Sequence, residues 1–321
     1  MIDTAPPAAA PKTVARSPRK PQERRGDRIF RWILAGLACS VIALALLFAW
    51  ELGLHSKLAW EKFGARFLST SNWDPVQGEF GALPFIYGTL VSSALALLIA
   101  LPLGTGAAVF MAELAPRRLS GALSFLVELL AAVPSVILGL MGIFALVPAV
   151  RAAEPWLERV LGWLPLFRGM PYGIGLLTAG LILAVMVLPY ITAITREVLL
   201  AVPRPLKEAM LALGATKAEV VWKVSLPYAR PAMIGAAFLA LGRALGETMA
   251  VTMVIGNTPQ ISWSLFDPAY TMASVIANEL AEATEDIHLA ALVAIGLALF
   301  GITVIVNAGA RLLVYRLERR P

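Results

Sequence analysis

The chain has 321 residues, of which 59% are hydrophobic and 15% charged, and its formal net charge is +6. Ordinary soluble domains carry far more charge than this, and a single cysteine excludes an intrachain disulfide. The soluble segments contain no basic stripe interleaved with aromatic residues. The positive charge is therefore not a signature of nucleic-acid binding.

Residues 1–28 are rich in Pro, Ala, Lys and Arg and predict a disordered basic tail. Six apolar blocks follow, each long enough to cross about 30 Å of hydrocarbon, which takes about 20 helical residues. They cover residues 29–50, 85–112, 122–150, 172–195, 231–255 and 289–314. The first block is too long for a signal-peptide core, so we expect it to be retained. The sequence predicts an all-α integral membrane protein, with residues 29–316 forming a six-helix transmembrane domain.

Lysine and arginine are distributed unequally between the two sets of connections. They crowd residues 12–31, 117–118, 196–230 and 311–320, which all fall on one side of the predicted helices. The other side carries only Lys57, Lys62, Arg66, Arg151, Arg159 and Arg168. Because positive loops stay inside, both termini are predicted to be cytoplasmic. The last outer loop, residues 256–288, has acidic residues and no Lys or Arg, which fits either a solvated surface or a docking or gating surface.

The connection at residues 196–230 is long for a simple loop and predicts two short helices, 203–213 and 217–224. Gly214 suits the left-handed position that ends a helix. Thr216 and Glu219 have the spacing of a capping box that starts the next one. Pro227 and Pro231 are expected to stop this hairpin and open the fifth span. From these features alone, a hairpin lying on the membrane surface and a docking element for a cytoplasmic partner are equally good interpretations.

Part of this hairpin resembles the EAA motif of ABC importer permeases. The matching residues are Glu208-Ala209-Met210, Gly214 and Val224-Ser225-Leu226-Pro227, with Met210 and Val224 as mild departures. The resemblance implies that residues 203–228 form the coupling hairpin, in which Glu208, Ala209, Gly214, Leu226 and Pro227 contact an ATPase subunit. No G-x-x-x-x-G-K-[ST] phosphate loop occurs in the sequence, so ATP and Mg²⁺ are expected to be used by that separate subunit. This chain is expected to bind no cofactor or metal and to catalyse no bond chemistry.

Arg243 and Glu247 are the charges predicted deepest in the membrane. Counted from Pro231 at 1.5 Å per residue, Arg243 lies about 18 Å into the fifth span, too deep for easy snorkelling. Glu247 follows one helical turn later and is the natural partner. The pair either locks helix packing or lies on a substrate path, where a guanidinium matches an oxyanion. Intramembrane charges favour the second interpretation.

The residues around this pair resemble the PstC family of phosphate permeases, which have the type I ABC importer (MetI-like) fold. The resemblance covers nearly the whole chain after the tail and is carried by residues 241–251, 255–258, 277–283 and 128–135. It implies phosphate translocation across the cytoplasmic (inner) membrane, with Arg243 and Glu247 on the path. It also implies three partners, namely a PstA-like second permease, a homodimeric PstB-like ATPase and a PstS-like binding protein outside.

Several alternatives remain open at this point. The cargo could be another oxyanion such as sulfate or molybdate, or the chain could be the partner permease PstA. A secondary transporter or channel would predict inverted repeats and would leave the hairpin spacing unexplained. An intramembrane enzyme would need a catalytic constellation at membrane depth. Glu128 in the third block is either buried or, as we favour, at the cytoplasmic interface, and Pro102 and Pro134 are expected to kink their helices.

Overall fold

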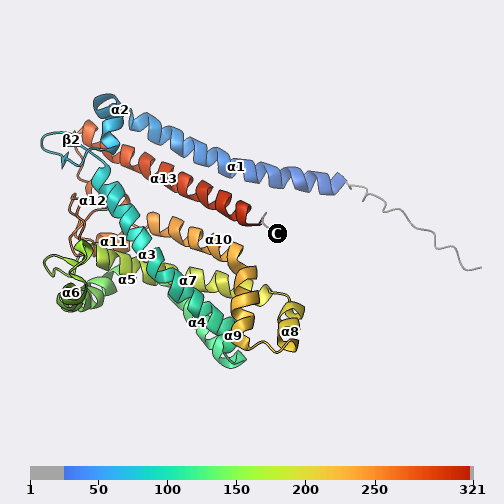
Figure 1. Cartoon of the computed structure of the whole chain (residues 1–321). Coiled ribbons are helices and arrows are strands. Elements are labelled where there is room, and N and C mark those ends of the chain that lie inside the picture. Colours follow the sequence, from blue (N-terminus) through green and yellow to red (C-terminus); the bar gives the residue numbers. More distant parts are fainter. Residues whose placement is uncertain (1–24, 319–321) are drawn as a thin grey trace, which may run out of the picture. The chain divides into compact units, whose positions relative to one another are not determined.

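The computed structural model describes residues 25–318, and most of this part of the chain is helical (Figure 1). Six helical stretches in it are long and apolar enough to cross a membrane, which confirms the predicted number. They are Arg28–His55, Leu83–Leu114, Ser135–Leu161, Leu176–Ala201, Lys217–Leu245 and Asp286–Leu312. The predicted tail lies mostly outside the described residues, and its last four residues already belong to the first helix.

By its internal contacts the chain divides into two compact units. The boundary follows Trp50 and lies within the long helix α1 (Arg25–His55). The second unit begins with α2 (Lys57–Phe63), the 3₁₀ turn η1 (Gly64–Leu68) and a short antiparallel hairpin, β1 (Trp73–Asp74) and β2 (Glu79–Phe80). Its first half continues with α3 (Leu83–Val109), η2 (Phe110–Leu114), α4 (Arg117–Ala132), α5 (Ser135–Met141), η3 (Gly142–Leu146), α6 (Val147–Leu161) and η4 (Pro165–Phe167). Its second half contains α7 (Leu176–Ala201), α8 (Arg204–Ala212), α9 (Lys217–Val220), η5 (Val221–Ser225), α10 (Leu226–Leu245), α11 (Met249–Thr252), α12 (Met272–Glu279) and α13 (Asp286–Glu318).

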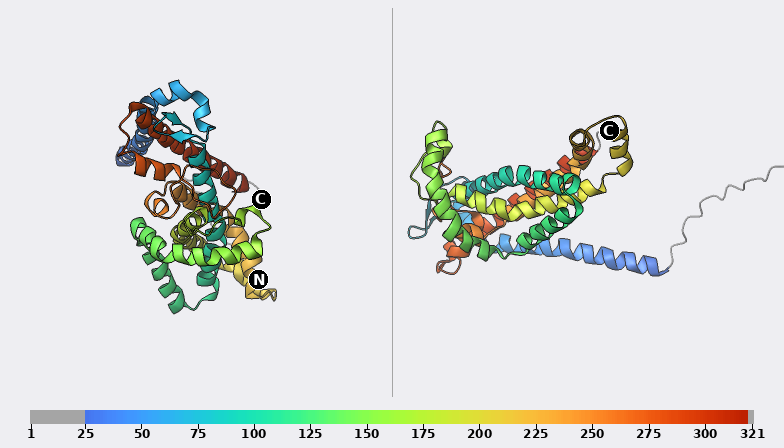
Figure 2. Two further views of the ribbon diagram at one scale, coloured as in Figure 1. Left: turned by 90° about the vertical axis from the view of Figure 1, so that its left-hand side faces the viewer. Right: turned by 90° about the horizontal axis from the view of Figure 1, so that it is seen from below.

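The third predicted span is wrong as a single helix. Helix α4 ends at Ala132, and Val133 and Pro134 are extended before α5 begins. Pro134 explains the break, because proline lacks an N–H and pushes the preceding residue out of the helical region. The expected kink at this proline is therefore a complete interruption. After the π turn η3 the chain continues as α6, which lies across the direction of α3 and α7 (Figure 2).

The fifth predicted span also differs from the structure. Helix α9 does not stop at Pro227 but continues through the π turn η5 into α10, so that one helical stretch runs over Lys217–Leu245. Helix α10 bends along its length in Figure 1, and its interior Pro231 accounts for the bend. The helix then ends at Leu245, ten residues before the predicted end at residue 255, and α11 follows as a separate short helix.

Helices α3 and α7 form the centre of the second unit, and small residues bring them together. A Cβ atom added at Gly104 of α3 would lie 3.0 Å from the Cγ2 atom of Ile191. A Cβ atom added at Gly180 of α7 would lie 2.5 Å from the Cδ2 atom of Leu95. Apolar lipid gives helices no hydrophobic reason to associate, so such close backbone approach supplies the packing energy.

The acidic segment at residues 256–288 is not a solvated surface over most of its length. Its first half folds into the core, with Leu265, Phe266, Tyr270 and Met272 all buried. Its last part is exposed, around Glu282 and Glu285 and at the start of α13, and in its first half Ile261 and Trp263 are exposed as well. The charge pattern of the loop predicted a surface because its acidic residues concentrate in this last part, whereas its first half is largely apolar.

The first turns of α3 are hydrogen-bonded to this buried segment and pack closely against it. The backbone N–H of Met272 donates a hydrogen bond of 2.9 Å to the hydroxyl of Thr89, and the Tyr87 hydroxyl donates to the carbonyl of Ser262. Between them, a Cβ atom added at Gly88 would lie only 2.2 Å from the carbonyl oxygen of Tyr270. The start of α3 and residues 262–272 therefore form one tightly packed block.

This close contact predicts a position-specific effect of adding a methyl group to α3. Gly88→Ala should lower the unfolding temperature of the purified protein, because overpacking costs about 1–3 kcal/mol. The matched change Gly106→Ala, in the same helix, meets no atom within 4 Å and should be neutral or stabilising. Thermal unfolding in detergent, followed by size-exclusion chromatography, measures both. Equal stability of the two variants would contradict the packing described.

Candidate functional site

Arg243 lies in the last turn of α10, and its side chain is exposed in the isolated chain. Its guanidinium carbon lies 4.5 Å from the centroid of the Tyr190 ring on α7. A guanidinium held over an aromatic face gains about 0.5–1 kcal/mol at an exposed site. Within the described part of the chain this guanidinium forms no salt bridge or hydrogen bond, so its N–H groups are available to a ligand.

The predicted pairing of Arg243 with Glu247 is wrong in this structure. Helix α10 ends at Leu245, and Gly246 forms a turn, so Glu247 is not one helical turn further along the same face. Within the described residues no salt bridge joins the two side chains. The Glu247 carboxylate instead accepts a long hydrogen bond of 3.4 Å from the backbone N–H of Ala250, at the start of α11.

The break between α10 and α11 is supported by close packing on the far side of α11. A Cβ atom added at Gly139 of α5 would lie 2.5 Å from the Met253 sulfur and 3.0 Å from the Cα atom of Ala250. Non-helical backbone at membrane depth requires protein or water around it. Helix α5 supplies the protein on one side, and the exposed Gly246 and Arg243 are on a side that this chain leaves uncovered.

Just beyond α11, residues 255–258 form a turn that depends on left-handed backbone. Gly256 has φ +93° and lies so close to Pro268 that an added Cβ atom would be 2.7 Å from the proline Cβ. Asn257 also has a positive φ of 49°, a conformation that asparagine tolerates better than most residues. Its amide donates to the Thr252 carbonyl at 2.9 Å, which ties the turn to α11.

The sequence reasoning missed a cluster around Glu279 in the second unit. One carboxylate oxygen of Glu279 lies 3.1 Å from the His288 ring nitrogen and accepts a 2.9 Å hydrogen bond from the Trp73 indole. The His288 ring stacks on Phe80, with ring centroids 5.2 Å apart. Burial raises the pKa of the neighbouring Tyr270 to about 12, so its hydroxyl stays protonated and accepts from Asn278. The cluster joins β1, β2, α12 and α13, and the large sequence separations hid it.

The two short helices predicted for the connection at residues 196–230 are present as α8 and α9. Helix α8 is followed by Gly214 at φ +86°, the left-handed conformation expected from the sequence. Thr216 and Glu219 form a complete capping box at the start of α9, in which the Glu219 backbone N–H donates to the Thr216 hydroxyl at 3.3 Å.

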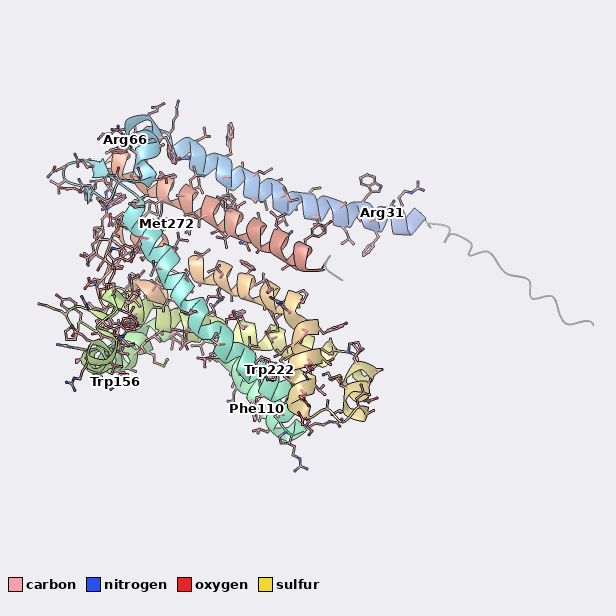
Figure 3. The ribbon with its side chains drawn as sticks, in the orientation of Figure 1. Arg31, Arg66, Phe110, Trp156, Trp222 and Met272 are labelled. Carbon is pink, nitrogen blue, oxygen red and sulfur yellow. The ribbon has the colours of Figure 1, made fainter. Side chains whose placement is uncertain are left out.

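The five residues expected to contact an ATPase lie on this hairpin or next to it. Glu208 and Ala209 are exposed on α8, and Gly214 is exposed at the turn. Leu226 and Pro227 are the first two residues of α10. They line a groove of about 770 Å³ together with Phe110 of η2 and Trp222 of η5, two side chains that Figure 3 labels near each other.

Glu128 is exposed on α4, which excludes the buried position that the sequence left open. It lines a cavity of about 290 Å³ with Ser124, Arg196 and Glu197, where α4 faces α7. The Arg196 guanidinium forms an ion pair of 2.6 Å with the Glu197 carboxylate. The buried Nε atom of Arg196 has no hydrogen-bond partner among the described residues. Two carboxylates beside one guanidinium make this cavity unfavourable for an anion.

No metal centre is formed by the described residues, since no three of their His, Cys, Asp or Glu side chains come together to hold an ion. What the arrangement offers instead is a set of surfaces. One is an exposed guanidinium at a helix break, and another is an exposed hairpin at the opposite end of α10. Both suit contacts with a transported ion or with other proteins.

Comparison with solved structures shows the fold. The chain is similar to a bacterial ABC transporter structure described as importing the acidic polysaccharide alginate, with a TM-score of 0.61 and 16% identity, covering 92% of this chain and 99% of that one. It is also similar to the MetNI methionine ABC transporter in an inward-facing conformation, with a TM-score of 0.54 and 19% identity, covering 77% of this chain and 100% of that one. The type I importer permease fold expected from the sequence is confirmed.

Comparison with curated proteins shows much closer relatives. The phosphate transport system permease protein PstC of Mesorhizobium japonicum is 47% identical over 92% of this chain and 91% of its own length. The protein of the same name from Xylella fastidiosa strain Temecula1 is 44% identical, over 93% of this chain and 94% of its own length. That from Haemophilus influenzae is 43% identical, over 89% and 91%.

A family described as the binding-protein-dependent transport system inner membrane component matches residues 100–319. Together with the six candidate spans, this match makes the chain a multi-pass inner-membrane protein and a transport subunit rather than an enzyme. The chain therefore belongs to the family of binding-protein-dependent inner-membrane permeases, in the branch of the PstC proteins.

Proposed function

We propose that this chain is a permease subunit of an ATP-driven importer of inorganic phosphate and that Arg243 contacts the anion during transport. The observation that carries the proposal is an exposed guanidinium at a point where a membrane helix is interrupted. The long helical stretch Lys217–Leu245 ends at this interruption, two residues beyond Arg243. The phosphate cargo is the one named for its close relatives.

The geometry around Arg243 suits an oxyanion. The guanidinium carbon lies over the Tyr190 ring, while the N–H groups stay free to donate to two oxygens of one anion. Glu247 does not occupy these donors, since its carboxylate is directed to the start of α11. In this proposal Glu247 lies beside the path and positions the break between α10 and α11.

The exposed side of the break requires a cover in the membrane. We assign this cover to a second, PstA-like permease, so that the path runs between two subunits. A homodimeric PstB-like ATPase would bind the α8 hairpin through the region of Glu208, Ala209 and Gly214, and would use the ATP and Mg²⁺. A PstS-like protein would deliver phosphate at the opposite face, and both termini of this chain would be cytoplasmic.

The first prediction concerns the planar fork of Arg243. Arg243→Gln should lower phosphate uptake per assembled complex by about 10- to 100-fold, the equivalent of one charged hydrogen-bonding group. Arg243→Lys should be impaired as well, because a point charge replaces the fork. The measurement is radiolabelled phosphate uptake in cells lacking other phosphate carriers.

Two control variants separate this role from packing. Arg230→Gln removes an exposed arginine near the other end of α10 and should leave uptake within about twofold. Tyr190→Leu removes the ring under Arg243 and should cost only about two- to fivefold, the value of an exposed cation–π contact. If Tyr190→Leu reproduces the full loss of Arg243→Gln, Arg243 is a packing residue.

The second prediction concerns the turn of the hairpin. Gly214→Val forces a β-branched side chain into left-handed backbone at a cost of about 1–2 kcal/mol, although no neighbour lies within 4 Å of an added Cβ atom. Gly214→Asn is the matched control, because asparagine tolerates this conformation. The valine variant should insert into the membrane but retain less ATPase on affinity purification, and the asparagine variant should retain it. Equal ATPase recovery in both would remove the hairpin from the docking surface.

The third prediction concerns orientation. In a Cys39→Ser background, Trp263→Cys should react with a membrane-impermeant thiol reagent added to intact cells, because Trp263 is 80% exposed on the outer segment. Trp222→Cys, at a position 73% exposed beside the hairpin, should react only after the cells are opened. The reverse order of labelling would invert the assigned topology.

A further inference from the structure

Helix α8 is attached to the rest of the second unit without any buried side chain. Leu206 and Leu211 are each 46% exposed and Leu213 is 84% exposed, although an amphipathic helix on a protein surface usually buries such residues. Only Lys207 and Met210 are partly covered. Apolar packing inside this chain therefore does not hold α8 in place.

A polar contact of Lys207 supplies the attachment. Its ammonium group lies 2.7 Å from the Oε1 atom of Glu113 and donates to the Leu199 carbonyl at 3.2 Å. The same Glu113 oxygen accepts a 2.8 Å hydrogen bond from the hydroxyl of Ser225. The Lys207 and Glu113 side chains are only 19% and 13% exposed, and Ser225 is fully buried. We call these three residues the Lys207 anchor.

The anchor joins elements that are far apart in the sequence. Glu113 lies in η2 at the end of α3, Lys207 in α8, and Ser225 in η5 at the start of α10. Both η2 and η5 are π turns, which are rare inside α-helices and are frequently found at functional sites. Beside the anchor, Ala108, Leu199 and Ala229 form a small buried cluster between α3, α7 and α10. The anchor thus lies where three membrane helices and α8 meet.

A half-buried ion pair of this kind restricts the position of α8 more strictly than exposed leucines do. Water screens the pair weakly, and both partners are also hydrogen-bonded, so that moving one requires moving the other or leaving a charge unpaired. A displacement of α8 is therefore passed to Glu113 and Ser225 through short, directional bonds. From there it reaches α3 and α10 directly.

We propose that the Lys207 anchor positions α8 and transmits its movement to α3 and α10. This inference rests on the proposed function, in which α8 binds the ATPase. The exposed leucines of α8 are then the surface that the ATPase covers, and the anchor is the connection on the opposite side. Glu113 and Lys207 are positioning residues, and neither contacts the transported ion.

The test uses the assembled importer in proteoliposomes, with the binding protein added and phosphate as the probe. Lys207→Met should leave the amount of complex and its basal ATPase rate unchanged, and it should lower both binding-protein-stimulated ATPase and phosphate uptake by about tenfold, within the usual range of coupling between sites. Lys207→Arg keeps the charge and the reach and should restore both rates. Lys57→Met, which breaks the exposed Lys57–Glu61 pair outside the hairpin, is the matched control and should behave as the unsubstituted chain.

A double variant covers the case in which Lys207→Met alone fails to assemble because Glu113 is left unpaired. Glu113→Gln with Lys207→Met removes both charges, and it should assemble, since neutral replacements of a pair are often tolerated, while staying uncoupled. Full uptake by an assembled variant without the pair would overturn the inference. So would failure of both the single and the double variant to assemble, which would assign the anchor to folding alone.

The same experiment distinguishes the inference from the proposed function. If the unsubstituted complex hydrolyses ATP and imports phosphate but Lys207→Met does so equally well, the anchor has no coupling role and the proposed function stands. If the unsubstituted complex shows no phosphate-dependent or binding-protein-dependent ATPase, the proposed function itself fails.

Discussion

A helix that ends inside a lipid bilayer leaves backbone N–H and C=O groups that lipid cannot satisfy, and this constraint governs the structure. The chain interrupts its helices at Val133–Pro134 and again at residues 246–248, and each interruption must be covered. Helix α5 covers one side of the second break, as the contact of Gly139 with Ala250 and Met253 shows. The other side, with Gly246 and Arg243, is exposed in this chain. In a membrane this side therefore needs water or another protein against it.

Features that depend on neighbours in the sequence could be predicted well. The hairpin turn follows from Gly214, and the start of α9 follows from Thr216 and Glu219, because a left-handed cap and a capping box are made by residues a few positions apart. The six apolar blocks follow from length and hydropathy alone. Hydropathy predicted the correct number of blocks. It did not predict where the helices are interrupted, because hydropathy does not report whether a helix is continuous.

The candidate site was predicted in part. Arg243 was identified from its depth, but its pairing with Glu247 assumed an unbroken helix, and Gly246 ends that helix. Two glycines one helical turn apart are compatible with a continuous, closely packed helix and also with a helix end. The sequence therefore did not distinguish these two structures. The contact with Tyr190, the Glu279 cluster and the bond from Lys207 to Glu113 join residues many positions apart. No pattern in a single sequence gives such pairs.

The continuity of helix α3 affects how a movement at one of its ends reaches the other end. It is continuous from Leu83 to Val109, about 40 Å at 1.5 Å per residue, even though Pro102 lies inside it. Its first turns are fixed to Tyr270 and Met272 by atomic contact, and Glu113 lies in η2 directly after its last turn. A continuous helix held at both ends is stiff along its axis. A displacement at one end of such a helix reaches the other end with no intervening loop to absorb it.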